Sequence, residues 1–125
     1  MLKLYYNPGS CSLASHAALE EAGLPYEAEL IDLTQNAQFS DAYRQKNPWA
    51  RVPALQIGDD VLTENIAILN HIAELVPEKA LLPTEGLARA RALEWLALRL
   101  CCKDWRQSEV GCRSAPIRRL LRNGG

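Results

Sequence analysis

One cysteine near the start of the chain lies where a strand is expected to give way to a helix. Cys11 follows the turn residues Asn7-Pro8-Gly9-Ser10, and a helical pattern begins with Ser12. The amides and the positive dipole end at a helix start favour a thiolate and lower the pKa of a cysteine there. Such a thiolate attacks electrophiles or holds a thiol-bearing ligand. No second cysteine follows at Cys-x-x-Cys spacing, which disfavours dithiol oxidoreduction.

The composition is typical of a soluble globular protein without a membrane or nucleic-acid role. The 125 residues are 48% hydrophobic and carry a net charge of −1, so no basic excess favours nucleic acid or a membrane surface. No apolar run is long enough for a membrane span, and no secretory signal pattern opens the chain. The four cysteines lack the spacing of a disulfide framework. We therefore expect reduced thiols and a cytoplasmic location.

Charge is distributed unevenly along the chain. Residues 1–100 carry 8 Lys and Arg against 13 Asp and Glu, whereas residues 101–125 carry 6 against 2. Three of the four cysteines also lie in residues 101–125. This break in composition marks the tail as different from the chain before it.

Hydrophobic periodicity predicts a βαβ unit, then a helix, two strands and a further helix. The expected strands cover residues 2–6, 26–32, 52–57 and 61–62. The expected helices cover residues 12–23, 37–45, 64–76 (with Thr63 as N-cap) and 87–100. The fold class is therefore α/β. We expect one domain over residues 1–77, a linker over 78–86 and a helical segment over 87–125.

Three separated motifs give the chain a resemblance to a known family. They are Leu4-Tyr5-Tyr6-Asn7-Pro8-Gly9-Ser10-Cys11-Ser12-Leu13, Asn47-Pro48-Trp49-Ala50-Arg51-Val52-Pro53-Ala54-Leu55 and Leu62-Thr63-Glu64-Asn65-Ile66-Ala67-Ile68-Leu69. In this order they resemble bacterial glutathione transferases, particularly the beta class. The resemblance implies a thioredoxin-like βαβ-α-ββα domain followed by the start of an all-helical domain. It also implies glutathione as co-substrate, a small electrophile as second substrate, a role in detoxification and no metal. The apolar surface of residues 87–100 predicts a homodimer, whose contact need not be the family's own.

The resemblance implies that Cys11 lies beside the sulfur of glutathione. There it would stabilise the glutathione thiolate or form a mixed disulfide with it. Tyr6 and Ser10 would line the same sulfur site.

The other parts of glutathione are implied to meet later segments of the chain. The Val52 backbone would pair with the cysteinyl part as an added strand does, next to Pro53 in a cis peptide bond. Glu64 and Asn65, at a helix N-terminus, would hold the γ-glutamyl end, with the carboxylate accepting from the ammonium. Gln35 would reach the glycyl end.

Other reactive side chains are interpreted as structural. His16 and His71 fall within helices that form the core, and no cluster with metal-ligand spacing surrounds them. Arg89, Arg91 and Arg99 recur on an amphipathic helix, where a solvated face is the default.

The chain departs from the family pattern at one residue and in its length. Ala50 lies where the family usually has Gly, a tolerable change even if the position needs positive φ. The all-helical second domain would be about as long as this whole chain, yet the resemblance stops after residues 87–100. A frameshifted or prematurely ended reading frame would produce such a tail, and so would divergence. Residues 87–100 would then expose an apolar patch of the kind found at interfaces.

Three hypotheses follow for the function. The first is a glutathione transferase that activates glutathione near Cys11, with turnover reduced by the short second domain. The second is thiol–disulfide exchange through a mixed disulfide of Cys11. The third is a non-catalytic, truncated member of the family.

Overall fold

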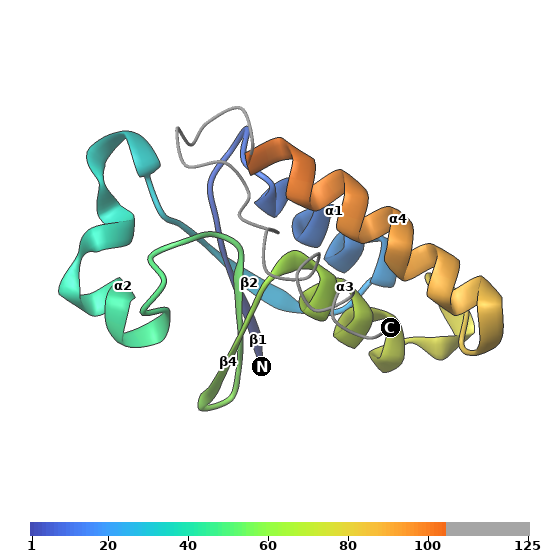
Figure 1. Cartoon of the computed structure of the whole chain (residues 1–125). Helices are drawn as coiled ribbons and strands as arrows, with labels where there is room; N and C mark the ends of the chain where they lie inside the picture. Colours follow the sequence, from blue (N-terminus) through green and yellow to red (C-terminus); the bar gives the residue numbers. More distant parts are fainter. Residues whose placement is uncertain (105–125) are drawn as a thin grey trace, which may run out of the picture.

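A mixed β-sheet forms the centre of the molecule (Figure 1). The computed structural model describes the backbone of residues 1–104 and the side chains of residues 1–98. Within this part of the chain the sheet has the order β2-β1-β3-β4. Its strands are β1 (Leu2–Tyr6), β2 (Tyr26–Leu30), β3 (Ala54–Ile57) and β4 (Asp60–Thr63). β1 is parallel to β2 and antiparallel to β3, and β3 and β4 form an antiparallel hairpin.

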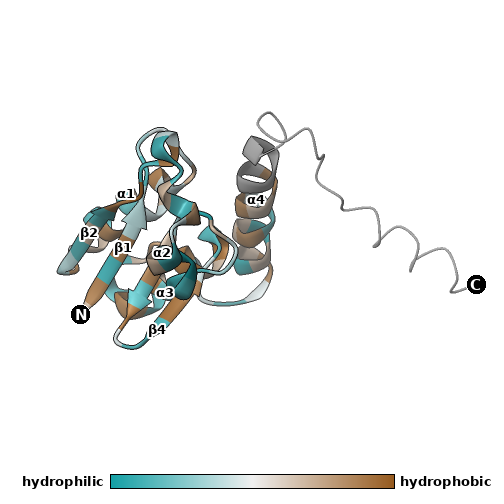
Figure 2. Ribbon diagram, turned by 90° about the vertical axis from the view of Figure 1, so that its left-hand side faces the viewer, coloured by the Kyte–Doolittle hydropathy of each residue, from teal (hydrophilic) through white to brown (hydrophobic). Residues whose placement is uncertain are grey.

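Helices cover this sheet and join its strands. They are α1 (Ser12–Ala22), α2 (Asp41–Lys46), α3 (Asn65–Leu75) and α4 (Gly86–Asp104), with single 3₁₀ turns η1 (Leu33–Gln35), η2 (Ala37–Phe39) and η3 (Pro77–Lys79). α1 and α3 pack against each other, and α4 lies against α3 (Figures 1 and 2). This βαβ-α-ββα order followed by a helix confirms the predicted thioredoxin-like α/β fold.

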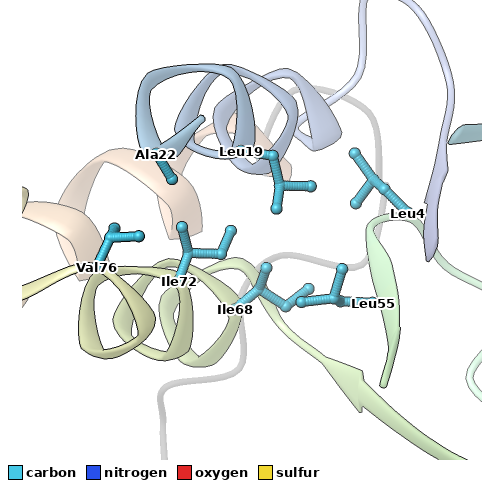
Figure 3. Packing of buried hydrophobic residues seen from close by; sticks show 7 residues of the cluster. All are labelled: Leu4, Leu19, Ala22, Leu55, Ile68, Ile72 and Val76. Carbon is cyan, nitrogen blue, oxygen red and sulfur yellow. The ribbon is translucent and has the colours of Figure 1, made fainter. Parts of the chain in front are cut away.

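The main hydrophobic core lies between the sheet and the α1–α3 pair (Figure 3). Its buried members are Leu4, Leu19, Ala22, Leu55, Ile68, Ile72 and Val76. A second cluster includes Tyr5 and Ala54 from the sheet and Tyr43 from α2. Because neighbouring strand residues point to opposite faces, Tyr5 enters the second cluster while Tyr6 packs against the first.

Several element boundaries differ from those predicted. The third strand begins at Ala54 rather than at residue 52, because Pro53 has no amide hydrogen for the ladder. The second strand ends at Leu30, and Asp32 instead caps η1 by accepting from the Thr34 amide over 2.9 Å. The predicted cap Thr63 was wrong: it remains in β4, paired with Ala54, and Glu64 occupies the N-cap of α3 without a side-chain cap bond.

Helix α4 extends beyond its predicted end. It continues to Asp104, so the first four residues of the atypical tail are helical, and residues 105–125 of that prediction lie outside the described residues. Leu87, Trp95 and Leu98 on this helix are exposed, which fits the predicted apolar patch. Figure 2 shows hydrophobic and hydrophilic residues alternating along α4 beside the rest of the fold. No helix within residues 1–104 is both long and apolar enough to cross a membrane.

Candidate functional site around Cys11

The loop before α1 is closed by a small cluster of polar groups. The Ser12 hydroxyl accepts from the Asn7 amide over 3.1 Å and donates to the Asn7 carbonyl over 3.0 Å. The Ser10 hydroxyl donates to the same carbonyl over 2.7 Å and lies 2.6 Å from the Ser12 hydroxyl. Ser12 is only 1% exposed. These bonds fix the turn that presents Cys11.

Cys11 occupies the N-cap of α1, as the sequence predicts for a reactive cysteine. The Cys11 side chain makes no cap bond, and the Cys11 carbonyl accepts from the Ala14 amide over 3.3 Å. The half-buried thiol donates to the Val52 carbonyl over 3.3 Å. Residues 41 positions apart in the sequence thus meet at the start of α1.

Two buried side chains hold the segment before β3: Tyr43 in α2 and Asn47, the C-cap of α2. The Asn47 amide group donates to the Arg51 carbonyl over 2.8 Å, and the Tyr43 hydroxyl donates to the same oxygen over 2.5 Å. Burial raises the pKa of Tyr43 to about 12, so the phenol remains a donor at neutral pH. The Val52-Pro53 peptide bond is cis, as the resemblance implies. Ala50 adopts a φ of 54°, the positive φ that explains why Gly is usual at this position.

The start of α3 approaches the same end of α1. The Asn65 side chain is 6% exposed and donates to the Cys11 carbonyl over 2.9 Å. Its oxygen accepts from the Ser15 hydroxyl over 2.6 Å. Glu64 is exposed and has a φ of 70° and a ψ of 125°, a conformation that non-glycine residues rarely adopt. A strained, exposed carboxylate at a helix start is the kind of feature that marks ligand contacts.

Tyr6 and Gln35 are two further residues predicted for this site. The half-buried ring of Tyr6 lies 4.9 Å from the His16 ring, edge to face, on the core side of the sheet. Gln35 ends η1 with an exposed side chain. However, the Asn7 side chain accepts from the Leu33 amide over 3.2 Å and so ties η1 to the loop before Cys11.

The structure therefore joins Cys11, Val52 and Asn65 directly and places Ser10, Pro53 and Glu64 next to them in the chain. Sequence reasoning missed the supporting residues Asn7, Ser12, Ser15, Tyr43 and Asn47. Only the turn propensity of Asn7 and Asn47 before proline signalled them. Their partners lie in other segments, so a local pattern does not reveal them.

Residues 1–98 hold no group of three or more His, Cys, Asp or Glu side chains placed to bind a metal ion. His16 lies between the rings of Tyr6 and Tyr26, at 4.9 and 5.8 Å, which supports a structural role. Two surface hollows of about 400 and 470 Å³ lie away from Cys11, beside Tyr26 and beside Arg89.

The prediction of a solvated Arg89 was wrong. Its guanidinium donates to the Pro83 carbonyl over 3.2 Å and to the Asn70 side chain, and Glu74 lies 3.8 Å away. Arg89 thus fastens α4 and the segment before it to α3. Arg91 is exposed and pairs with Glu94 over 3.0 Å, as expected of a surface residue. The side chain of Arg99 lies outside the described residues.

Comparisons with known proteins agree with this fold. The family model "Glutathione S-transferase, N-terminal domain" matches residues 1–74. The glutathione S-transferase GstA of Escherichia coli O157:H7 is 41% identical over 98 residues, which are 76% of this chain and 49% of that protein. A glutathione S-transferase of Xanthomonas campestris is 41% identical over 98 residues, 77% of this chain and 47% of that protein.

Solved structures give the same result. A glutathione transferase homologue from Sulfitobacter with bound glutathione has a TM-score of 0.72 at 40% identity, covering 78% of this chain and 49% of that one. A sphingomonad glutathione S-transferase in complex with glutathione has a TM-score of 0.68 at 42% identity, covering 77% and 49%. The chain spans about half the length of the curated relatives that it matches. Through this N-terminal domain, the chain belongs to the glutathione S-transferase family.

Proposed function

We propose that this chain binds glutathione beside Cys11 and activates its thiolate for conjugation to a small electrophile. The observation that carries the proposal is the 3.3 Å contact between the Cys11 thiol and the Val52 carbonyl. It brings a thiol at a helix N-terminus to the backbone segment that would pair with the cysteinyl part of glutathione. The relatives named as glutathione transferases, and the related structures with bound glutathione, support it.

In the proposed complex the glutathione cysteinyl amide takes the place of the Cys11 thiol on the Val52 carbonyl. This exchange releases the thiol toward the glutathione sulfur, which it then stabilises as a thiolate. Ser10 and Tyr6 line that sulfur site, and Pro53 continues the segment into β3. In conjugation the glutathione sulfur forms a bond to an electrophilic carbon, and the leaving group departs with the electron pair of the bond that breaks.

The γ-glutamyl end is proposed to lie at the start of α3. The exposed Glu64 carboxylate accepts from the ligand ammonium, and the backbone amide of Asn65 donates to the ligand α-carboxylate. The Asn65 side chain is occupied by Cys11 and Ser15, so we assign its ligand contact to the backbone. Gln35, carried on the tied turn η1, reaches the glycyl end.

The wider organisation is also a proposal. Residues 1–77 form the glutathione-binding domain, residues 78–86 the linker and residues 87–125 the beginning of a helical domain. A match to the family model that ends at residue 74 supports this division. The exposed Leu87, Trp95 and Leu98 of α4 support a homodimer or other protein contact. We place the protein in the cytoplasm, in detoxification, without nucleic-acid or membrane partners.

A second candidate function is glutathione-dependent thiol exchange, favoured by the cysteine itself. A Cys11 thiolate that attacks the glutathionyl sulfur of a mixed disulfide forms a Cys11–glutathione disulfide and releases the other thiol. Reduced glutathione then attacks this bond, frees Cys11 and leaves as oxidised glutathione. The third hypothesis, a non-catalytic family member, needs no chemistry from Cys11.

One pair of assays separates these candidates. Conjugation of glutathione to chloro-dinitrobenzene is measured beside glutathione-dependent reduction of a small disulfide, with wild type and Cys11→Ser. The proposal predicts conjugation that falls in Cys11→Ser. Disulfide reduction alone supports the second candidate, and absence of both activities, with glutathione still bound, supports the third.

A further inference from the structure

The side-chain amide of Asn65 links α3 to α1, because its nitrogen and its oxygen each bond to a residue of α1 or its N-cap. Its nitrogen donates to the Cys11 carbonyl over 2.9 Å, and its oxygen accepts from the Ser15 hydroxyl over 2.6 Å. A carbonyl oxygen only accepts, so the bond to Cys11 fixes the orientation of the amide. Asn65 is 6% exposed and Ser15 is fully buried. We call this arrangement the Asn65 bridge.

The Asn65 bridge holds the first turn of α1 at two points. Cys11 and Ser15 are four residues apart and therefore lie on one side of the helix. The Cys11 carbonyl also accepts from the Ala14 amide, but over the longer distance of 3.3 Å. The Ser10 hydroxyl accepts from the Ser12 amide over 3.2 Å, and the bridge adds a bond from α3 to the Cys11 carbonyl.

The position of the Cys11 thiol depends on the position of the Cys11 backbone. The thiol reaches the Val52 carbonyl over 3.3 Å, so a small shift of the Cys11 backbone would break that contact. We propose that Asn65 is a positioning residue that, with Ser15, holds the Cys11 thiol at the start of α1 beside Val52. This inference rests on the proposed function only for the identity of the ligand that the thiol meets.

A purely structural role for Asn65 makes a different prediction. The α1–α3 contact also contains Leu19, Ile68 and Ile72, which are buried in the main core. If Asn65 only joined the helices, its loss would lower stability and leave the reactivity of Cys11 unchanged. If it positions Cys11, its loss changes how readily the thiol reacts at neutral pH.

The test is alkylation of the whole chain by iodoacetamide, read on the Cys11 peptide by mass spectrometry. In Asn65→Ala we expect the Cys11 rate constant at pH 7 to fall about tenfold, because a displaced thiol moves away from the positive dipole end of α1. At about pH 9.5, where most thiols ionise unaided, we expect a fall of about twofold at most. Arg51 and Glu64, the charged residues next to Val52 and Asn65 in the sequence, are exposed and unchanged in this variant.

Two further variants locate the effect in the bridge. Asn65→Asp keeps an acceptor for Ser15 but loses the donor to Cys11, so it should slow Cys11 at pH 7 at least as much as Asn65→Ala. Ser15→Ala leaves the bond to Cys11 in place and should slow Cys11 by about threefold. If Asn65→Ala does not fold, these two variants carry the test.

Asn70→Ala is the matched control, because Asn70 lies on the same helix and bonds to Glu74 and Arg89. It should keep the wild-type ratio of rates at the two pH values. The inference is overturned if the folded bridge variants keep that ratio, or if Asn70→Ala changes it equally. Calorimetric titration with glutathione tests the proposed function independently. If the wild-type chain does not bind glutathione, the proposed function is refuted, but the inference that Asn65 positions Cys11 is not affected.

Discussion

Replacing Glu64 by glycine should stabilise the protein and weaken glutathione binding together. Glu64 occupies the N-cap of α3 with a φ of 70° and a ψ of 125°, and its side chain makes no cap bond. It is exposed, so its removal leaves no cavity. Glycine adopts this conformation without strain, whereas a non-glycine residue there costs about 1–3 kcal/mol.

The expected gain is smaller than the strain itself. Glycine also makes the unfolded chain more flexible, which costs about 0.4–1 kcal/mol. We therefore expect Glu64→Gly to raise the free energy of unfolding by about 1 kcal/mol and the melting temperature by about 4 °C. Loss of a charge-assisted bond to the ligand ammonium should weaken glutathione binding by about tenfold or more.

Ala50→Gly is the matched control, because Ala50 also has a positive φ, at 54°, but carries no side chain assigned to the ligand. Thermal unfolding followed by circular dichroism, and titration calorimetry with glutathione, are measured on both variants. Ala50→Gly should gain stability and keep its affinity. The reasoning is refuted if Glu64→Gly is less stable than wild type, or if both variants bind glutathione equally well.

Three further predictions concern the core, the turn η1 and α4. Ile68→Ala should lower the free energy of unfolding by about 2–5 kcal/mol in a denaturant titration, because Ile68 is fully buried in the main core. A loss below about 1 kcal/mol would contradict this packing. Hydrogen bonds from Thr34 hold the pKa of Asp32 below its ordinary value of 3.8. The ionised Asp32 carboxylate therefore stabilises the fold above about pH 4, and this stabilisation is lost as the carboxylate is protonated at lower pH. Asp32→Asn should therefore make the free energy of unfolding depend less on pH below about pH 4. An unchanged acid-unfolding curve would contradict the proposed cap of η1 by Asp32. Arg89→Met should speed hydrogen exchange over residues 81–90 without changing glutathione affinity, because it removes the bonds that fasten α4 to α3; unchanged exchange would refute that role.

The sequence was sufficient for features that depend on local pattern. Tyr5 and Tyr6 had to face opposite sides of a strand, and the structure places them in separate clusters. Cys11 was expected at the start of a helix because turn residues precede it and a helical pattern follows, and it is the N-cap of α1. The resemblance also marked Ala50 as a position for Gly, which its positive φ explains.

Contacts between distant segments could not be predicted in this way. Asn65 at a helix start can cap its own helix or bind a ligand, and only the packing of α1 on α3 shows that its side chain reaches Cys11 and Ser15. The position of Arg89 on an amphipathic helix predicts a solvated side chain. Its actual partners, Pro83 and Asn70, depend on how the segment before α4 packs against α3. Thr63 has the chemistry of an N-cap, but pairing with Ala54 keeps it in the sheet.

The central claim is that glutathione binds beside Cys11, and titration calorimetry tests it most directly. Glutathione is titrated into the wild-type chain, and the Cys11 peptide is then tested for protection from iodoacetamide at saturating ligand. We expect one glutathione per chain, slower alkylation of Cys11 in its presence, and weaker binding in Glu64→Gly than in Ala50→Gly. Absence of binding, or binding that leaves the alkylation rate of Cys11 unchanged, would contradict the account.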